Sequence, residues 1–302
     1  MPYELESRLV IGVASSALFD LTDSDMVFRS DGEDAYRRYQ ADNIDVTLGA
    51  GVAFPFVRRL LALNDLQPGD PVVEVIVLSK NDPSTGLRVM RSIAAHALPM
   101  SRAVFTQGEA PHRYMSAFGM SLFLSADERD VKAALGVGQP AGQVLPSAAV
   151  EDLDDGGVLR VAFDFDGVLA DDGAERVYQA GTIADFREYE TVNRMRPHGE
   201  GPLKRFLVGI DRIQRIEQVR SDGDRDYVRR LRVSLVTARD APAHERAVRT
   251  LEQWGVTVND AFFLGGIDKG RVLEVLRPHI FFDDQTTHLA STACFAPSVH
   301  IP

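Results

Sequence analysis

The chain contains a single cysteine, Cys294, among its 302 residues. One cysteine excludes an intramolecular disulfide and fits a reducing compartment. No partner base of the kind that activates a thiol nucleophile accompanies it in the sequence. We therefore expect Cys294 to be a small, buried apolar side chain rather than a reactive group.

Basic residues are also scarce relative to acidic ones. The chain has 33 lysines and arginines and 44 acidic residues, which gives a formal net charge of −11. Nucleic-acid binding relies on clustered lysine and arginine side chains that neutralise phosphates. We therefore expect no nucleic-acid partner. A small anionic substrate would have to be attracted by local groups, since the net field of the protein repels it.

Long hydrophobic runs are missing as well. No apolar stretch approaches the roughly 20 residues needed to cross a bilayer. The first ten residues, MPYELESRLV, carry acidic side chains in place of a basic segment followed by an apolar core. We expect no membrane partner, no signal peptide and a cytoplasmic location. An apolar content of 45% suffices for real cores, and the length suggests roughly two domains.

The most informative stretch is DFDGV at 164–168, which follows the apolar run Leu159–Phe163. Two carboxylates at positions i and i+2, at the end of a strand and followed by a glycine turn, suit phosphoryl transfer to an aspartate. Aspartate and glycine also crowd ordinary turns for local reasons, so this stretch alone leaves a plain turn open. The catalytic interpretation of this stretch is strengthened because other polar groups follow two later strands.

Those two later strands end in a hydroxyl group and in a pair of carboxylates. Val233–Val236 leads into Thr237 and Ala238, and Ile280–Phe282 leads into the pair Asp283-Asp284. Lys269 lies just before the helix that precedes the second of these strands. The carboxyl ends of parallel strands meet at one edge of an α/β sheet, where ligands bind. We therefore expect these groups to form one site.

Each group has an expected role. Asp164 is the nucleophile, and Asp166 is the general acid for the leaving oxygen and then the base for the hydrolytic water. Phosphate oxygens are bound by the Thr237 hydroxyl and the Ala238 backbone N–H, while Lys269 neutralises charge in the transition state.

Mg²⁺ is the expected cofactor, because it prefers octahedral oxygen ligation. Its expected ligands are acidic groups and one carbonyl, and which member of the final pair binds it directly is left open: Asp164, the Asp166 carbonyl, Asp283 and Asp284. His279 and His288 flank that pair, but neither has metal-site spacing to another histidine, so structural roles are favoured for both.

The order of DFDGV, the LVT ending, Lys269 and FFDD resembles the four motifs of the haloacid dehalogenase superfamily. Longer stretches are similar to cytosolic type I 5′-nucleotidases: VAFDFDGVL, GPLKRFL (201–207), LVTARD, KGRVLEVLRPHIFFDDQTTH (269–288), GVAFPFVRRLLALN (51–64), TGLRVMRSI (85–93) and LFLSADERDV (122–131). The motif order favours Lys269 over Lys204 as the phosphate lysine.

This resemblance, which spans most of the chain, implies Mg²⁺-dependent hydrolysis of nucleoside 5′-monophosphates, typically AMP or IMP, and hints at a homo-oligomer. It also implies a Rossmann-like parallel sheet with a small helical cap. Two rival functions remain open: a phosphatase for another small phosphomonoester, and a nucleotide-binding regulatory protein with vestigial catalysis. Substrate preference and any allosteric effector are not specified by the residues.

The expected domain organisation has an N-terminal α/β half at 1–135, a Gly/Pro/Ala-rich linker at 136–157 and a catalytic domain at 158–302. A cap insertion is expected at about 170–231. Helical character marks Glu175–Gln179 and Leu203–Val219 within it, and the apolar stripe of the second is more often core than substrate contact. In the N-terminal half we expect strands at Arg8–Ala14, Val72–Leu78, Ala103–Phe105 and Leu122–Leu124, and helices at Glu33–Asp42 and from Pro55.

The two halves resemble each other when shifted by 158 residues. The shift pairs Ser79 with Thr237 and Ser125 with Asp283 without a gap, and it also pairs Arg88 with Arg246. We hypothesise that the N-terminal half is a degenerate copy of the catalytic fold. The copy lacks the catalytic groups, because Pro111, Ser125 and Ala126 stand opposite Lys269, Asp283 and Asp284. The alternative is a chance match of two α/β patterns.

Arg239 directly follows the expected phosphate-binding residues. Two interpretations are open from the sequence: the side chain binds phosphate, or it pairs with Asp240 or Glu245 at the surface.

Overall fold

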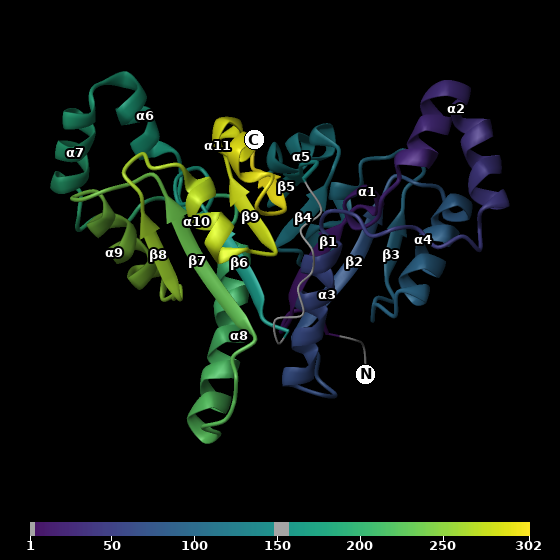
Figure 1. The fold of residues 1–302 in the computed structure, drawn as a ribbon, viewed down its shortest axis with the longest axis horizontal. Coiled ribbons are helices and arrows are strands. Elements are labelled where there is room, and N and C mark those ends of the chain that lie inside the picture. Colours follow the sequence, from purple (N-terminus) through teal and green to yellow (C-terminus); the bar gives the residue numbers. More distant parts are fainter. Residues whose placement is uncertain (1–3, 148–156) are drawn as a thin grey trace. The chain divides into compact units, whose positions relative to one another are not determined.

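Two α/β units make up the chain, Met1–Val144 and Leu145–Pro302, which we call the N-terminal and the C-terminal unit. The computed structural model describes residues 4–147 and 157–302 (Figure 1). All strand pairings within the described parts of each unit are parallel. The α/β class expected from the sequence is therefore confirmed.

The N-terminal unit has its five strands in the order β3-β2-β1-β4-β5. Its elements are β1 (Leu9–Val13), α1 (Ser15–Leu18), α2 (Thr22–Asp42), α3 (Phe54–Ala62), η1 (Leu63–Leu66), β2 (Val73–Ser79), α4 (Pro83–Ala95), β3 (Ala103–Phe105), η2 (Pro111–Tyr114), η3 (Ser116–Phe118), β4 (Leu122–Ser125), α5 (Glu128–Leu135) and β5 (Ala141–Val144). β1 and β2 are buried along their whole length, as their largely apolar sequences, LVIGV and VEVIVLS, predict for central parallel strands.

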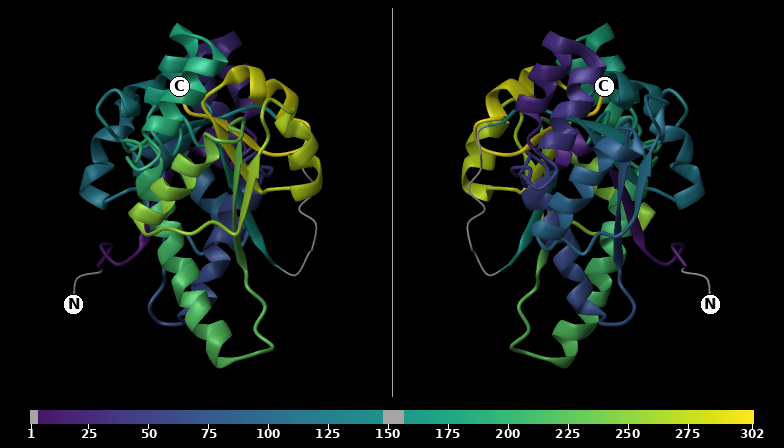
Figure 2. Two further views of the ribbon diagram at one scale, coloured as in Figure 1. Left: turned by 90° about the vertical axis from the view of Figure 1, so that its left-hand side faces the viewer. Right: turned by 90° about the vertical axis from the view of Figure 1, so that its right-hand side faces the viewer.

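The C-terminal unit has its five strands in the order β8-β7-β6-β9-β10. Its elements are β6 (Leu159–Phe163), α6 (Gly173–Ala180), α7 (Ile183–Val192), α8 (Lys204–Gly223), β7 (Leu231–Thr237), α9 (His244–Trp254), β8 (Asp260–Phe263), α10 (Lys269–Leu276), β9 (Ile280–Asp283), α11 (Thr286–Thr292) and β10 (Ser298–His300). The side views show α8 and α9 on one face of this sheet and α10 and α11 on the other (Figure 2).

The two units therefore share one topology. In each, the first strand is central, the second and third lie on one side of it, and the fourth and fifth lie on the other. An isolated antiparallel bridge follows the first strand in both, between Phe19 and Ala50 and between Ala170 and Glu200. A glycine comes directly after each bridge, where an added Cβ would lie within 3 Å of backbone atoms. These parallels are what the repeat hypothesis requires.

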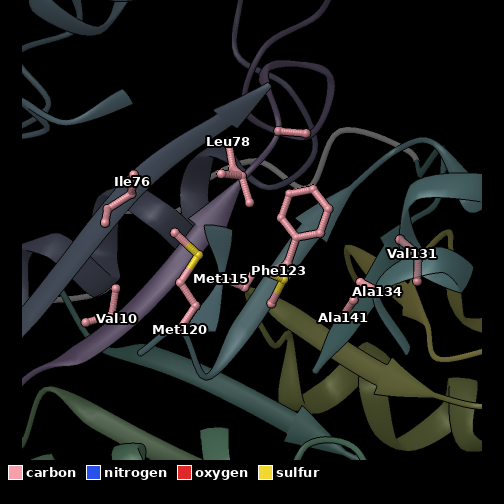
Figure 3. Close-up of a cluster of buried hydrophobic side chains, with 10 residues drawn as sticks. Val10, Ile76, Leu78, Met115, Met120, Phe123, Val131, Ala134 and Ala141 are labelled. Carbon is pink, nitrogen blue, oxygen red and sulfur yellow. The ribbon is translucent and has the colours of Figure 1, made fainter. Parts of the chain in front are cut away.

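Each unit has its own core. In the N-terminal unit, apolar side chains from the sheet, from α5 and from the segment that leads into β4 pack together (Figure 3): Val10, Ile76, Leu78, Met115, Met120, Phe123, Val131, Ala134 and Ala141. In the C-terminal unit, Phe163 of β6 stacks on Phe282 of β9 with ring centroids 5.1 Å apart. Phe206 of α8 packs edge-on against both rings.

The packing of Phe206 separates two parts of the expected cap insertion at 170–231. α8 packs its apolar stripe on the sheet, and Phe206, Leu207, Ile210 and Ile213 are buried there. The preference for core over substrate contact is thus confirmed for this stripe. α6 and α7 lie beyond the carboxyl ends of β6 and β7 (Figure 1). α7 was not predicted from the sequence.

Three other local expectations differ from the structure. β5 occupies Ala141–Val144 inside the segment expected as linker, and residues 148–156 of that segment lie outside the described residues. α2 begins at Thr22, well before the expected start at Glu33, and changes direction at Gly32. Cys294 is exposed, so the expectation of a buried thiol was wrong. It lies just beyond the last turn of α11, where its Sγ approaches the Ser291 carbonyl.

Candidate active site

Three buried charged side chains meet at the carboxyl ends of β6 and β9. Asp164 directly follows β6, Asp283 ends β9, and the backbone N–H of Asp164 donates to the Phe282 carbonyl at 2.8 Å. The Nζ of Lys269, at the first turn of α10, lies 2.8 Å from Asp164 Oδ2 and 2.7 Å from Asp283 Oδ2. All three are at most 4% exposed. The parallel register of β6 and β9 therefore brings together three of the predicted residues.

Burial and mutual charge set the protonation of this cluster. Burial, with the neighbouring Asp283 charge, raises the pKa of Asp164 to about 6 against the attraction of Lys269. Burial opposes the charge on Lys269 too, but the two carboxylates raise its pKa above the usual value. Although burial favours the neutral acid, hydrogen bonding to His288 and the Lys269 charge lower the pKa of Asp283. The lysine is thus a fixed positive charge beside the expected nucleophile.

Asp284 has a different environment from Asp283. Its Oδ1 is buried and has no hydrogen-bond partner among the described residues. Burial, reinforced by the charges on Asp164 and Asp283, raises the pKa of Asp284 to about 7. Gly167 lies directly against it, because an added Cβ would be 2.4 Å from Asp284 Oδ2, and its φ of +69° also favours glycine. A buried carboxylate oxygen without a partner is costly unless a cation or donor reaches it.

The acidic groups fit a hard divalent cation. Asp164, Asp283 and His288 offer ligand atoms within 4.8 Å of one another. Both oxygens of Asp283 are engaged, however, since Oδ2 accepts from Lys269 and Oδ1 accepts from the Gln285 N–H. The unpartnered oxygen of Asp284 is the better match for an oxygen-seeking ion. Within the final acidic pair, the donor set therefore favours Asp284 as ligand and Asp283 as the partner of Lys269.

The expected phosphate-binding residues lie at the end of the next strand. β7 pairs with β6 in parallel and ends at Thr237, which is 1% exposed. The Thr237 hydroxyl oxygen accepts the Arg239 backbone N–H at 3.3 Å. Ala238 between them is exposed. An accessible backbone segment beside a buried hydroxyl suits a bound anion.

Asp166 has a partner that sequence reasoning missed. Arg239 donates from Nε and Nη2 to its two carboxylate oxygens at 2.7 and 2.6 Å. A third donor, Nη1, reaches Glu190 of α7. Neither interpretation of Arg239 anticipated these contacts, and the proposed pairing with Asp240 or Glu245 was wrong. Asp240 pairs instead with Arg187, and Glu245 pairs with Arg249.

The structure also distinguishes the two candidate phosphate lysines and the two histidines near the acidic pair. Lys204 bonds Glu200 and lies over the Trp254 ring at 5.3 Å, while Lys269 contacts Asp164, as the motif order implied. His279 Nδ1 accepts the Arg160 backbone N–H at 3.0 Å, which is a structural role. His288 Nδ1 lies 3.3 Å from Asp283 Oδ1, so it supports the acidic cluster more closely than expected.

The raised pKa values predict how the metal-free protein responds to pH. Asp164 and Asp284 hold protons in the folded state at pH values where the unfolded chain has released them. These groups therefore make stability fall as the pH rises from about 4 to about 7. Urea unfolding in a chelator at about pH 5 and about pH 8 measures this, and Asp284→Asn should show a shallower loss. An identical pH dependence in the variant would contradict the assigned environment of Asp284.

Buried acids, a lysine and a hydroxyl gather at the carboxyl ends of parallel strands, which defines the class of the protein: an α/β protein with a candidate ligand site where open α/β sheets commonly bind their ligands. The family model described as 5′-nucleotidase matches residues 1–302. The chain belongs to the 5′-nucleotidase family. It is 32% identical over 294 residues to human cytosolic 5′-nucleotidase 1B, an alignment that covers 95% of this chain. The prediction of this family from the sequence motifs is thus confirmed.

The alignment covers 48% of the human protein, so the chain spans about half the length of that relative. No solved structure matches the chain. In the parts of the chain that the structure describes, no helix combines the length and apolar character needed to cross a membrane.

Proposed function

We propose that the protein hydrolyses nucleoside 5′-monophosphates to a nucleoside and phosphate, with Asp164 as the nucleophile. The observation that carries the proposal is the buried ion cluster of Asp164, Lys269 and Asp283, in a chain that the 5′-nucleotidase family model matches throughout. The name of the human relative describes a cytosolic 5′-nucleotidase. We extend that activity and compartment to this chain as part of the proposal.

In the first step, a carboxylate oxygen of Asp164 attacks phosphorus and the bond from phosphorus to the ester oxygen breaks. Asp166 gives its proton to that leaving oxygen, which departs as the nucleoside 5′-hydroxyl. Lys269 stays charged because two carboxylates surround it, and it offsets the negative charge of the phosphoryl group. Thr237 and the Ala238 N–H bind phosphate oxygens in this scheme.

In the second step, Asp166 removes a proton from water, whose oxygen attacks phosphorus and releases Asp164 and inorganic phosphate. Asp164, the Asp166 carbonyl and Asp284 would hold Mg²⁺, which supplies positive charge to the phosphate when bound. The unpartnered oxygen of Asp284 supports this set. Asp283 keeps Lys269 in place rather than binding the ion.

The N-terminal unit has a different role in this proposal. Ala14, whose N–H donates to Leu124 as that of Asp164 does to Phe282, stands at the nucleophile position. The hydroxyls of Ser15 and Ser79 bond each other at 3.1 Å at the same strand ends. We propose that this unit is a non-catalytic copy of a haloacid dehalogenase-like fold, supported by the shared strand order.

A panel of phosphomonoesters tests the substrate. Phosphate release from AMP, IMP and other nucleoside monophosphates should exceed that from sugar phosphates by at least about tenfold in kcat/KM, a difference of roughly 1.4 kcal/mol in transition-state binding. A preference for sugar phosphates would support the rival phosphatase. Nucleotide binding without turnover would support the regulatory protein. Oligomeric state remains a prediction for light scattering to check.

A further inference from the structure

Glu190 is a buried carboxylate that the mechanism above does not use. It lies on α7 and is 1% exposed, and three basic side chains surround it: Arg239, Arg246 and His198. Burial favours the neutral acid, but the close approach of His198 Nε2, 3.4 Å from Glu190 Oε2, and the charge of Arg239 lower the pKa of Glu190 to about 2. It is therefore a permanent negative charge inside the protein.

Arg239 connects this charge to the reacting groups. Nε and Nη2 bond Asp166, and Nη1 bonds Glu190 and the Ala243 carbonyl. The guanidinium is 3% exposed and lies between the rings of Phe165 and Phe186, 5.2 and 5.6 Å from their centroids. With its donors turned to protein oxygens, Arg239 holds Asp166 in a bidentate grip rather than reaching for a substrate phosphate.

The N-terminal unit shows which part of this network serves the fold alone. There Arg88 donates to Gln40 at 3.1 Å and to the Val46 carbonyl at 3.0 Å. In the C-terminal unit Arg246 donates to Glu190 at 2.8 Å and to the Arg196 carbonyl at 2.8 Å. Each arginine also lies over a tyrosine ring, Tyr39 in one unit and Tyr189 in the other.

These positions correspond by two offsets: 150 in the connection after the first strand, which pairs Gln40 with Glu190 (190 − 40), and 158 in the helix after the second strand, which pairs Arg88 with Arg246 (246 − 88). In both units, this contact therefore anchors the helix between the first and second strands to the helix after the second strand. These helices are α2 and α4 in the N-terminal unit and α7 and α9 in the C-terminal unit. An amide suffices for this contact, because Gln40 needs only one acceptor oxygen.

Two features occur in the C-terminal unit alone. The second oxygen of Glu190 accepts from Arg239, and the offset of 158 places Asn81 opposite Arg239 (239 − 81). Ser16 stands where Asp166 does, once Gly167 is taken as one extra residue in that loop. The added carboxylate, the added arginine and the expected proton-transfer residue therefore occur together in the unit that carries the acidic cluster.

We infer that Glu190 and Arg239 are positioning residues for the reaction: Glu190, carried by α7, fixes Arg239, which fixes the carboxyl group of Asp166 for proton transfer. This rests on the proposed hydrolysis at Asp164, but it does not depend on the substrate being a nucleotide.

Glu190→Gln is the decisive variant. An amide keeps one oxygen for Arg246, as Gln40 does for Arg88, but it turns an NH₂ group toward Arg239 and cannot accept its hydrogen bond. The anchor of α7 survives while the grip on Arg239 is lost. Arg239→Lys removes the bidentate geometry and keeps the charge. Arg88→Lys in the N-terminal unit is the matched control.

The experiment compares two leaving groups. One substrate is the alkyl phosphomonoester that the wild type hydrolyses fastest in the panel, and the other is p-nitrophenyl phosphate, whose leaving group departs without protonation. For Glu190→Gln and Arg239→Lys we expect the single-turnover rate of the first step, in which the leaving group departs, to fall about 10- to 100-fold on the alkyl ester, with KM and the first-step rate on p-nitrophenyl phosphate within about threefold. The second step, in which Asp166 acts as the base, is common to both substrates and should slow equally for both. Arg88→Lys should leave the ratio of the two substrates unchanged.

Equal losses of the first-step rate on both substrates would overturn the inference, since they indicate a general structural defect. A large rise in KM at constant kcat would overturn it in favour of phosphate binding by Arg239. A wild type that hydrolyses sugar phosphates best would refute the nucleotidase proposal but leave this comparison valid. A wild type inactive on both substrates would refute both.

Discussion

Replacing Asp164 by asparagine should lower turnover by at least about 1,000-fold while the protein stays folded, because an amide is a poor nucleophile and a weak metal ligand. Burial already disfavours the Asp164 charge, whose pKa is raised to about 6, so neutralising it costs the fold little. Lys269 retains Asp283 as a partner. Phosphate release under saturating substrate measures turnover, and thermal unfolding measures the fold.

Asp130→Asn is the matched control for this substitution. Asp130 is 8% exposed and pairs with Lys80 in the N-terminal unit, so it presents the same change at another buried, lysine-paired aspartate. We expect its turnover to stay within about threefold of the wild type, as for a change remote from the chemistry. Full activity of Asp164→Asn would refute the covalent mechanism.

The second large effect is metal dependence. Chelation should abolish turnover, and added Mg²⁺ should restore it. Asp284→Asn should lower turnover by at least about 100-fold at Mg²⁺ concentrations that saturate the wild type, because a bound ion contributes several kcal/mol to the transition state. An independent readout is thermal unfolding: Mg²⁺ should raise the Tm of the wild type but not that of Asp284→Asn.

Asp260→Asn controls for loss of an acidic group from the same sheet. Asp260 begins β8, at the opposite edge from the site, and pairs with Arg232. Its Mg²⁺ response should equal that of the wild type. If Asp283→Asn lost the Mg²⁺-induced rise in Tm and Asp284→Asn kept it, the ligand assignment within the pair would be reversed.

Much of the fold was predictable because its signals are local. β2 and β6 are largely apolar, with one charged residue each at Glu74 and Arg160, which is typical of strands covered on both faces, and each strand end carried a visible polar group. Lys269 was placed correctly because its motif order is a property of the chain itself. β5 was missed since Ala141–Val144 is short and contains glycine, and its pairing with β4 decides its conformation.

The Arg239 contacts could not be predicted, because the partners lie 73 residues away at Asp166 and 49 residues away at Glu190. Glu190 gave no sequence signal: acidic residues on helices are common and usually exposed. The Gln40–Arg88 and Glu190–Arg246 pairs occupy corresponding positions in the two units, but only the coordinates reveal that these side chains touch.

The sequence alone determined the α/β class, the family and the set of acidic, basic and hydroxyl residues at the strand ends, because periodicity and motif order are written along the chain. Tertiary structure decided how those residues divide their work. Burial left one oxygen of Asp284 without a partner, tied Asp283 to Lys269, and placed Arg239 between Asp166 and Glu190. Such assignments depend on distance and solvent exclusion, which arise only when segments remote in sequence pack together.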